Sequence, residues 1–450
     1  MTKFEELREK YPEFIYDSYD IEYDANYLKV TFNFDIPNLT KFNPTLKIDK
    51  KNIKNQNIND KYLNYLVFHI GLIELISYVK CTCSPNIIIK CGYLNNEQIN
   101  FFKKLYYYGL GEFLYINKIN TDINSLFNIK VDYEEEVLPD INYEGLGNLI
   151  PIGGGKDSNV TLEILKSEYN INDCFIINPK TIQLECVKVG GYADKLITVS
   201  RTLDKRLLEL NSKGFLNGHT PFSSLVAFIS YLVAYLANKK YIILSNEGSA
   251  NESTIVGTKI NHQYSKTYEF ENDFNEYTNK HFRIDIKYFS LLRALSEYQI
   301  SLLFSNYDKY HKVFKSCNVG SKKEPWEWCS NCAKCLFVYI ILSPFLYKDK
   351  LINIFGNDLY ENKELLNVFI ELLGYSDTKP FECVGTYSEV RYAVSKTINK
   401  LGDNLPYLLE YFKDNYKLEL DHNLEKDYNN ENNIEPHFEE LLKKELDKYV

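Results

Sequence analysis

The chain has 450 residues, of which 45% are hydrophobic and 25% are charged, as in an ordinary folded protein of two or three domains. Its net charge of −9 argues against a general nucleic-acid-binding protein, so an anionic substrate would need a local basic pocket. Residues 1–6 are charged rather than signal-like, and the apolar stretches 222–237 and 336–347 are too short or interrupted to span a bilayer. We expect a cytoplasmic protein without membrane or nucleic-acid partners. The sequence does not predict the oligomeric state.

Residues 1–143 are predicted to form an α+β domain. Apolar and polar residues alternate over 28–36, the period-2 pattern of a half-buried strand, and 19–23 precede it across a turn, which predicts a hairpin. Residues 62–80 are apolar almost all round and predict a buried helix in which His69 is a core residue. A strand is expected at 87–89, a helix at 96–108 that stops at 109–112, and an acidic linker at 132–139.

Residues 144–312 alternate between strands and helices. Strands are expected at 149–152, 174–178, 196–200 and 241–244, and helices at 157–169, from 204 onward, and at 222–237. Repeated strand–helix units predict a parallel sheet with helices on both faces. Such sheets bind ligands at the carboxyl ends of their strands. The polar residues that follow each strand are therefore expected to converge on one crevice.

Three consecutive glycines, Gly153, Gly154 and Gly155, join the first of these strands to a helix. Glycine tolerates positive φ and lets a ligand approach the backbone, and the start of a helix attracts phosphate. The spacing does not fit the Walker A pattern or a dinucleotide fingerprint. It resembles the PP-loop of ATP pyrophosphatases, with Gly153 in place of the first serine. The alternative is a glycine-rich turn that binds no ligand.

The predicted ATP-binding residues come from this turn and from the later strand ends. They are Gly153, Gly154, Gly155, Lys156, Asp157, Ser158, Asn178, Arg201, Asn246 and Glu247. Asp157 is expected to hold Mg²⁺, with Glu247 as the candidate second ligand.

Four cysteines, Cys317, Cys329, Cys332 and Cys335, are closely spaced. Four thiolates suit tetrahedral Zn²⁺ and leave no open position for catalysis, so a structural zinc is predicted. An iron–sulfur cluster is the alternative. Trp326 and Trp328 are expected to pack over the metal. The zinc would staple a helical C-terminal region, 313–420, to the nucleotide domain, and 421–450 would form a flexible linker and a terminal helix.

The candidates for proton transfer, in order of preference, are His262, Lys266, His219 and Cys383. His262 and Lys266 belong to a polar cluster, 261–266, that can equally be a solvated loop. Cys383 follows a compact loop and can equally be a buried thiol.

Several stretches together carry a resemblance to one family. They are 75–85, 109–115, 153–158, 216–221, 245–250, 261–271, 316–318 with the cysteines after it, and 379–385. The chain resembles the ATP-dependent UDP-N-acetylmuramoyl-L-alanyl-L-glutamate epimerases of peptidoglycan synthesis. The resemblance implies a PP-loop fold like that of the adenine nucleotide α-hydrolases, ATP, Mg²⁺ and a nucleotide-linked peptide ending in L-glutamate. It does not identify the residues that move the proton.

Two other functions remain open at this point. A PP-loop protein with a four-cysteine zinc site also resembles amide- or nitrile-forming synthases such as 7-cyano-7-deazaguanine synthase, in which ammonia attacks the adenylate. The chain can also be a nucleotide-binding module without catalysis. Formation of AMP and its dependence on ammonia separate the three.

Overall fold

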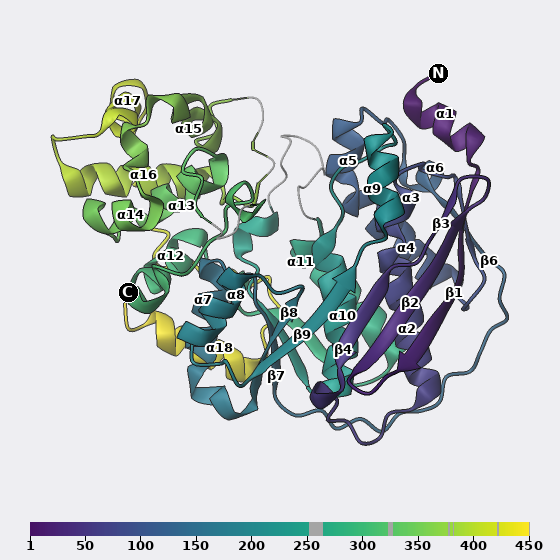
Figure 1. Ribbon diagram of the computed structural model, residues 1–450. Coiled ribbons are helices and arrows are strands. Elements are labelled where there is room, and N and C mark those ends of the chain that lie inside the picture. Colours follow the sequence, from purple (N-terminus) through teal and green to yellow (C-terminus); the bar gives the residue numbers. More distant parts are fainter. Residues whose placement is uncertain (252–263, 323–326, 377–378, 381, 421–422, 450) are drawn as a thin grey trace.

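The computed structural model describes residues 1–251, 264–322, 327–376, 379–380, 382–420 and 423–449, built around one eleven-stranded sheet (Figure 1). The main path of the sheet runs β11-β10-β7-β8-β9-β4-β2-β1-β5-β6, and β3 pairs with β2. The strands are β1 (Glu13–Tyr23), β2 (Tyr27–Ile36), β3 (Thr40–Phe42), β4 (Thr45–Asp49), β5 (Asn86–Ile89), β6 (Asn128–Val131), β7 (Asn148–Pro151), β8 (Asn172–Ile177), β9 (Leu196–Thr202), β10 (Tyr241–Leu244) and β11 (Lys287–Ser290).

The predicted hairpin is confirmed, because β1 and β2 pair antiparallel and β2 buries every second residue. The sequence did not reveal that β4 pairs antiparallel with both β2 and β9. That pairing joins the N-terminal strands to the following strands across the predicted boundary at 143. The sheet as a whole is therefore mixed rather than parallel.

The strands after residue 144 pair in parallel, as predicted. β8 lies on one side of β7 with β9 beyond it, and β10 lies on the other side with β11 beyond it. The chain thus reverses its direction of travel across the sheet between β7 and β10. In open α/β sheets a reversal of this kind opens a crevice at the carboxyl ends of the two strands. The glycine turn follows β7 and Glu247 follows β10, so both lie at this position.

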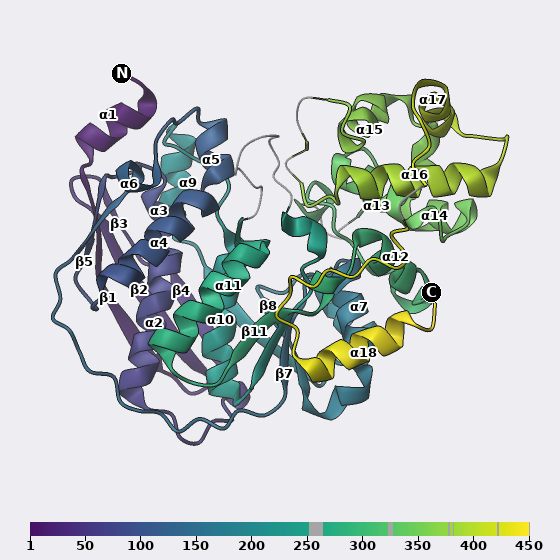
Figure 2. The same cartoon turned by 180° about the vertical axis from the view of Figure 1, so that it is seen from behind.

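One face of the sheet is covered by α2 (Asp60–Glu74), α3 (Ile76–Val79), α4 (Asn96–Gly109), α10 (Phe222–Ala237) and α11 (Tyr268–Tyr277) (Figure 2). The predicted buried helix at 62–80 is confirmed as α2 and α3, and His69 is fully buried within it. Residues 60–79 are long and apolar enough to cross a membrane, but 89% of the most apolar window is buried, as in a core helix. The predicted stop after α4 is only a break, since α5 (Gly111–Ile116) begins at once.

The opposite face carries α7 (Lys156–Ile164), α8 (Thr181–Val189), α12 (Glu297–Ser305) and α18 (Pro436–Leu446). The same hydrophobic core continues into a helical lobe of α13 (Ala333–Leu342), α14 (Lys348–Phe355), α15 (Leu366–Leu372), α16 (Tyr387–Leu401) and α17 (Tyr407–Asn415) (Figure 1). The remaining helices are α1 (Lys3–Lys10), α6 (Ile123–Leu126) and α9 (Lys205–Ser212). In Figure 1 the helical lobe lies at the upper left, and α5 and α9 lie at the upper right.

The segment before α18 was expected to be a flexible linker, but its described part is bound along the protein. Gln299 donates to the carbonyls of Glu425 and Asp427, and the amide of Asn429 donates to Ala294. α18 then packs Phe438 against the ring of Tyr241 in β10. Leu424, Tyr428 and Ile434 add apolar contacts with the core, so hydrogen bonds and apolar packing together hold this polar segment in place.

Gly71 in α2 is predicted to be required for packing. A Cβ added there would lie 1.9 Å from the hydroxyl oxygen of the buried Tyr16. Overpacking of this kind costs about 1–3 kcal/mol, so Gly71→Ala is expected to lower the free energy of unfolding by that amount in urea. Gly153→Ala is the control, since its Cβ would meet no atom of the described residues within 4 Å. Equal stability of the two variants would contradict the prediction.

Candidate active site

The glycine turn at the end of β7 is uncrowded at Gly153, whereas Gly154 and Gly155 lie against neighbouring side chains. Gly154 has a φ of 85°, a backbone conformation that is strained for residues with a side chain. A Cβ on Gly153 would contact none of the described atoms within 4 Å. Gly155 caps α7 without a side-chain hydrogen bond. The hydroxyl of Ser158, within the helix, accepts the amide of Gly154 at 3.2 Å and so closes the turn. The turn thus leads into the start of α7, and it is uncrowded at Gly153.

Neighbouring elements fix this turn by its carbonyl groups. Gly154 accepts a hydrogen bond from the amide of Lys315 at 3.0 Å, and Ile152 accepts one from the side chain of Gln183 at 3.0 Å. The thiol of Cys186 also donates to Gly154, at 3.6 Å. The shape of the turn therefore depends on α8 and on the chain that leads to the cysteine cluster.

The side chain of Lys156 is buried in an ion-pair network. Its ammonium lies between Asp157 and Glu297 and donates to both carboxyl groups, and the side chains of Lys156 and Glu297 are only 3% and 1% exposed. Burial alone lowers the pKa of Lys156, but the two carboxylates outweigh it and raise the pKa. Burial raises the pKa of Glu297 to about 8 although Lys156 opposes it. Lys156 therefore organises two carboxyl groups, and its contact with ATP stays a prediction.

A second buried carboxyl group secures Glu297. The backbone amide of Glu297, in the first turn of α12, donates to Oε1 of Glu389 at 2.7 Å. Oε2 of Glu389 accepts the amide of Thr386 at 2.7 Å in a capping box at the start of α16. Burial raises the pKa of Glu389 despite these hydrogen bonds. The helical lobe is thereby tied to the glycine turn through α12.

Glu247 and Lys266 are held by one buried arginine. The guanidinium of Arg293, which is fully buried, donates to the carbonyl of Glu247 at 2.9 Å and to that of Lys266 at 2.7 Å. It also pairs with Glu271 at 3.1 Å. The chain after β10 and the chain before α11 are therefore fixed at the same point.

Cys383 lies between two lysines. The ammonium of Lys266 donates to its sulfur at 3.4 Å, and that of Lys334 donates to its carbonyl. Burial alone would lower the pKa of Lys266, but the side chain of Cys383 and then the carboxylates of Glu247 and Asp157 raise it. Burial works against the charge on Asp157, but Lys156 and Lys334 lower the pKa of that carboxyl group. Two lysines, two carboxylates and a thiol thus meet beside the turn.

The structure brings together four residues predicted for separate roles: Asp157, Glu247, Lys266 and Cys383. His262 lies outside the described residues. His219 lies elsewhere, with Nδ1 3.7 Å from the carboxylate of Glu112 in α5. Its role in proton transfer stays a prediction.

Three of the predicted ATP-binding residues hold strand ends together. Asn178 exchanges hydrogen bonds with the backbone of Arg201, both at 2.7 Å, and Asn246 donates to the hydroxyl of Ser290 at 3.1 Å. The guanidinium of Arg201 makes a two-point ion pair with Glu74. Contact of these residues with ATP stays a prediction.

Sequence reasoning missed Glu297, Lys334 and Arg293 and gave Glu389 no role. Two local signals were available. Lys334 stands between two of the clustered cysteines, and Thr386 with Glu389 has the spacing of a capping box. Nothing in the sequence around Glu297 or Arg293 distinguishes them from surface charges on a helix.

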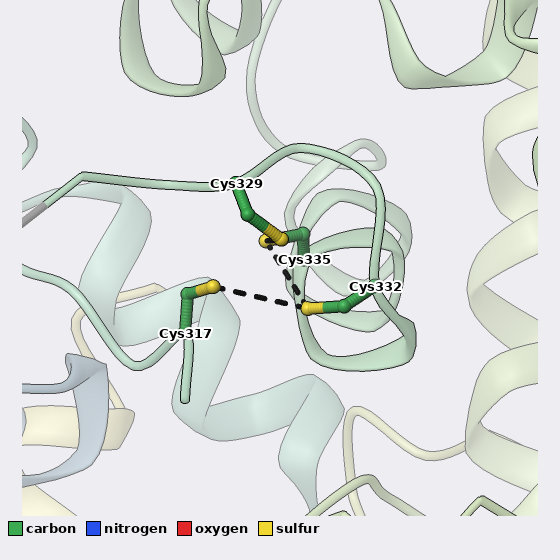
Figure 3. A group of neighbouring side chains, drawn as sticks. All are labelled: Cys317, Cys329, Cys332 and Cys335. Carbon is green, nitrogen blue, oxygen red and sulfur yellow. Dashed lines mark hydrogen bonds between the residues drawn. The ribbon is translucent and has the colours of Figure 1, made fainter. Parts of the chain in front are cut away.

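The four clustered cysteines have the arrangement of a metal site (Figure 3). Their sulfur atoms all lie within 4.8 Å of one another, with neighbours at 3.5–3.8 Å. A tetrahedron of sulfurs around zinc has edges of about 3.8 Å, given a bond of ~2.3 Å. The amide of Gly320 donates to the sulfur of Cys317 at 3.1 Å, which supports a thiolate. The cluster can therefore hold a metal ion such as zinc.

Trp328 packs between Phe314 and Phe355, with ring centroids 5.3 and 4.7 Å away. It therefore contributes to the apolar packing of the cysteine loop. Trp326 lies outside the described residues.

Comparison with known proteins decides the family. Residues 5–291 match the MurL N-terminal domain and residues 313–422 match the MurL C-terminal domain. The chain belongs to the MurL family. A Xanthomonas oryzae pv. oryzae relative named UDP-N-acetyl-alpha-D-muramoyl-L-alanyl-L-glutamate epimerase is 34% identical over 332 residues, 72% of this chain and 73% of its own. A relative of the same name from Salinispora tropica is 33% identical over 72% of this chain and 71% of its own length. Another from a Micromonospora species is 33% identical over 71% of this chain and 72% of its own length. The resemblance seen in the sequence is confirmed.

The cysteine cluster of this MurL protein is predicted to bind about one zinc per chain, since four thiolates at this spacing complete its coordination. Cys332→Ser is expected to lose the metal and lower the melting temperature, because structural zinc contributes directly to folding. Cys91→Ser, outside the cluster, is the matched control and should retain both. Metal analysis of the purified protein checks this. Iron with a visible absorption band would instead indicate an iron–sulfur cluster.

Proposed function

We propose that the protein inverts the terminal L-glutamate of UDP-N-acetylmuramoyl-L-alanyl-L-glutamate in an ATP-dependent reaction of cytoplasmic peptidoglycan synthesis. Family membership and the name shared by the three relatives support the substrate and the inversion. The observation that carries the mechanism is the meeting of Asp157, Glu247, Lys266 and Cys383 beside the glycine turn. The turn at the sheet reversal also supports a PP-loop fold like that of the adenine nucleotide α-hydrolases.

ATP solves the main difficulty of this inversion. The Cα–H beside a carboxylate is very weakly acidic, because its loss places a second negative charge next to the first. When a carboxylate oxygen attacks the α-phosphorus of ATP, pyrophosphate leaves and an uncharged acyl group forms as a mixed anhydride with AMP. The Cα proton can then be removed and returned on the other face. Water finally attacks the acyl carbon and releases AMP and the nucleotide dipeptide, which now ends in D-glutamate.

The glycine turn and the start of α7 would hold the pyrophosphate portion of ATP, because backbone amides and the helix dipole favour phosphate there. Asp157 and Glu247 would hold Mg²⁺, since hard divalent cations prefer carboxylate oxygens. That ion would screen the phosphate charges during attack. Lys156 and Glu297 keep Asp157 in position.

Proton transfer is assigned to Cys383 and Lys266, whose reactive atoms lie 3.4 Å apart. The ammonium stabilises the thiolate, which makes Cys383 the candidate base, while Lys266 is a candidate acid. Lys334 adds a donor beside them that can stabilise a developing enolate. His262 remains a further candidate, and His219 a weaker one because it lies by Glu112.

Turnover in D₂O tests the proposed reaction. Protein, ATP and the L-glutamate nucleotide dipeptide are expected to yield AMP, pyrophosphate and a nucleotide dipeptide whose terminal D-glutamate carries deuterium at Cα. Chiral analysis and mass spectrometry measure the product. Ammonia-dependent product would indicate an amide- or nitrile-forming synthase. ATP binding without AMP formation would indicate a nucleotide-binding module, and either result would overturn the proposal.

Cys383→Ser is predicted to separate activation from proton transfer. A hydroxyl is far less acidic than a thiol, so epimerisation should fall by at least about 100-fold, within the range that a positioned base contributes. Exchange of pyrophosphate into ATP, which reports adenylation, should stay within a few-fold of the unmodified protein. Cys91→Ser is the control and should change neither. Full epimerisation by Cys383→Ser would remove Cys383 from the mechanism.

A further inference from the structure

A separate cavity of about 280 Å³ lies beside the end of β9, between that strand, α3, α9 and the start of α10. Its polar side includes Lys80 and Arg201, and its apolar side includes Leu203, Leu208 and Phe222. The volume is near the lower limit of ~300 Å³ for small-molecule pockets. It therefore suits one section of a large ligand better than the whole.

Lys80 is a buried cation that no carboxylate compensates within the described residues. It is only 5% exposed, and its ammonium donates to the carbonyl of Gly218 and to the hydroxyl of Thr220, the latter at 2.6 Å. These are neutral acceptors, and they leave one of its three N–H groups available. Burial lowers the pKa of Lys80 to about 8. A buried ammonium without a carboxylate partner among the described residues is suited to bind the anionic group of a ligand.

Arg201 adds donors on the same side of the cavity. Its Nε and one terminal nitrogen bind Glu74, and that terminal nitrogen also binds Ser77 at 3.0 Å. The other terminal nitrogen has no hydrogen bond to a described residue. Because Glu74 neutralises Arg201, Lys80 leaves this polar side with a net positive charge.

The opposite side of the cavity exposes apolar side chains. Leu203, Leu208 and Phe222 are 38%, 58% and 47% exposed, values that are high for large hydrophobic residues on three neighbouring elements. An anion-binding corner beside an apolar wall is suited to a ligand that joins phosphate to a flat ring.

The cavity is distinct from the proposed ATP site. Arg201 lies in β9, two strands from β7, and adjacent strands are ~4.8 Å apart, so the glycine turn is about 10 Å away along the sheet. Arg201 also faces α2, whereas α7 packs on the other face of the sheet. A ligand that reaches both places must be extended and must carry its phosphates far from the reacting carboxylate.

We propose that this cavity binds the uridine diphosphate end of the nucleotide-linked substrate. The inference rests on the proposed function, which supplies a substrate with a diphosphate and a pyrimidine far from its glutamate. Lys80 and the free nitrogen of Arg201 bind the diphosphate, and Phe222 with Leu208 packs against the ring. The cavity would thereby select the nucleotide-linked peptide over a free peptide.

Calorimetric titration with UDP, without ATP, tests the assignment. The unmodified protein should bind UDP saturably, and Lys80→Met should weaken binding at least about tenfold, equivalent to ~1.4 kcal/mol. Phe222→Ser changes an exposed residue and should weaken UDP binding several-fold while the protein stays folded. Leu401→Ser, exposed to 41% on α16, is the matched control and should bind UDP normally. ATP binding should be unchanged in all three variants.

The outcomes separate this inference from the proposed function. UDP binding that responds to Lys80→Met and Phe222→Ser supports the cavity even if no epimerisation is detected, in which case only the proposed reaction fails. If the protein epimerises the dipeptide substrate but UDP does not inhibit competitively against that substrate, the assignment of the cavity is wrong and the proposed reaction stands. Normal UDP binding by both variants also overturns it.

Discussion

The active-site arrangement depends on one buried lysine. Lys156 stands in the first turn of α7 with a side chain that is 3% exposed, and a charge in that position is stable only if carboxylates surround it. Asp157 comes from the same helix, but Glu297 comes from α12, which is fastened in turn to Glu389 of α16. The start of α7 is therefore linked through α12 to the helical lobe.

The cysteine cluster does more than hold the helical lobe in place, because residues next to it contact the candidate active site. Lys334 lies between two of the cysteines and donates to the carbonyl of Cys383, while Lys315, just before the cluster, donates its amide to Gly154. A metal that fixes the cysteines would therefore also fix a donor beside the thiol and one wall of the turn. The region around the cluster would then position Lys334 and Lys315 in the site, whereas the proposed phosphate-binding turn follows strand β7 of the sheet.

The sequence predicted what local patterns encode. Alternation predicted the hairpin of β1 and β2, and strand–helix repeats predicted the parallel strands. Cysteine spacing predicted a cluster that can hold a metal ion. It did not predict the pairing of β4 with β9, because strand pairing across 150 residues leaves no local pattern. Glu297 and Arg293 were missed for the same reason. Their partners lie on other elements, and a charged residue on a helix looks the same whether it is buried or exposed.

The central claim is that ATP activates the carboxylate beside the inverted carbon, and an isotope measurement tests it most directly. The glutamate carboxylate is labelled with ¹⁸O and the products are examined by mass spectrometry after turnover. The carboxylate oxygen that attacks the α-phosphorus stays on phosphorus when water attacks the acyl carbon. The account therefore predicts AMP that carries one ¹⁸O atom. Unlabelled AMP, or ADP as the nucleotide product, would contradict it.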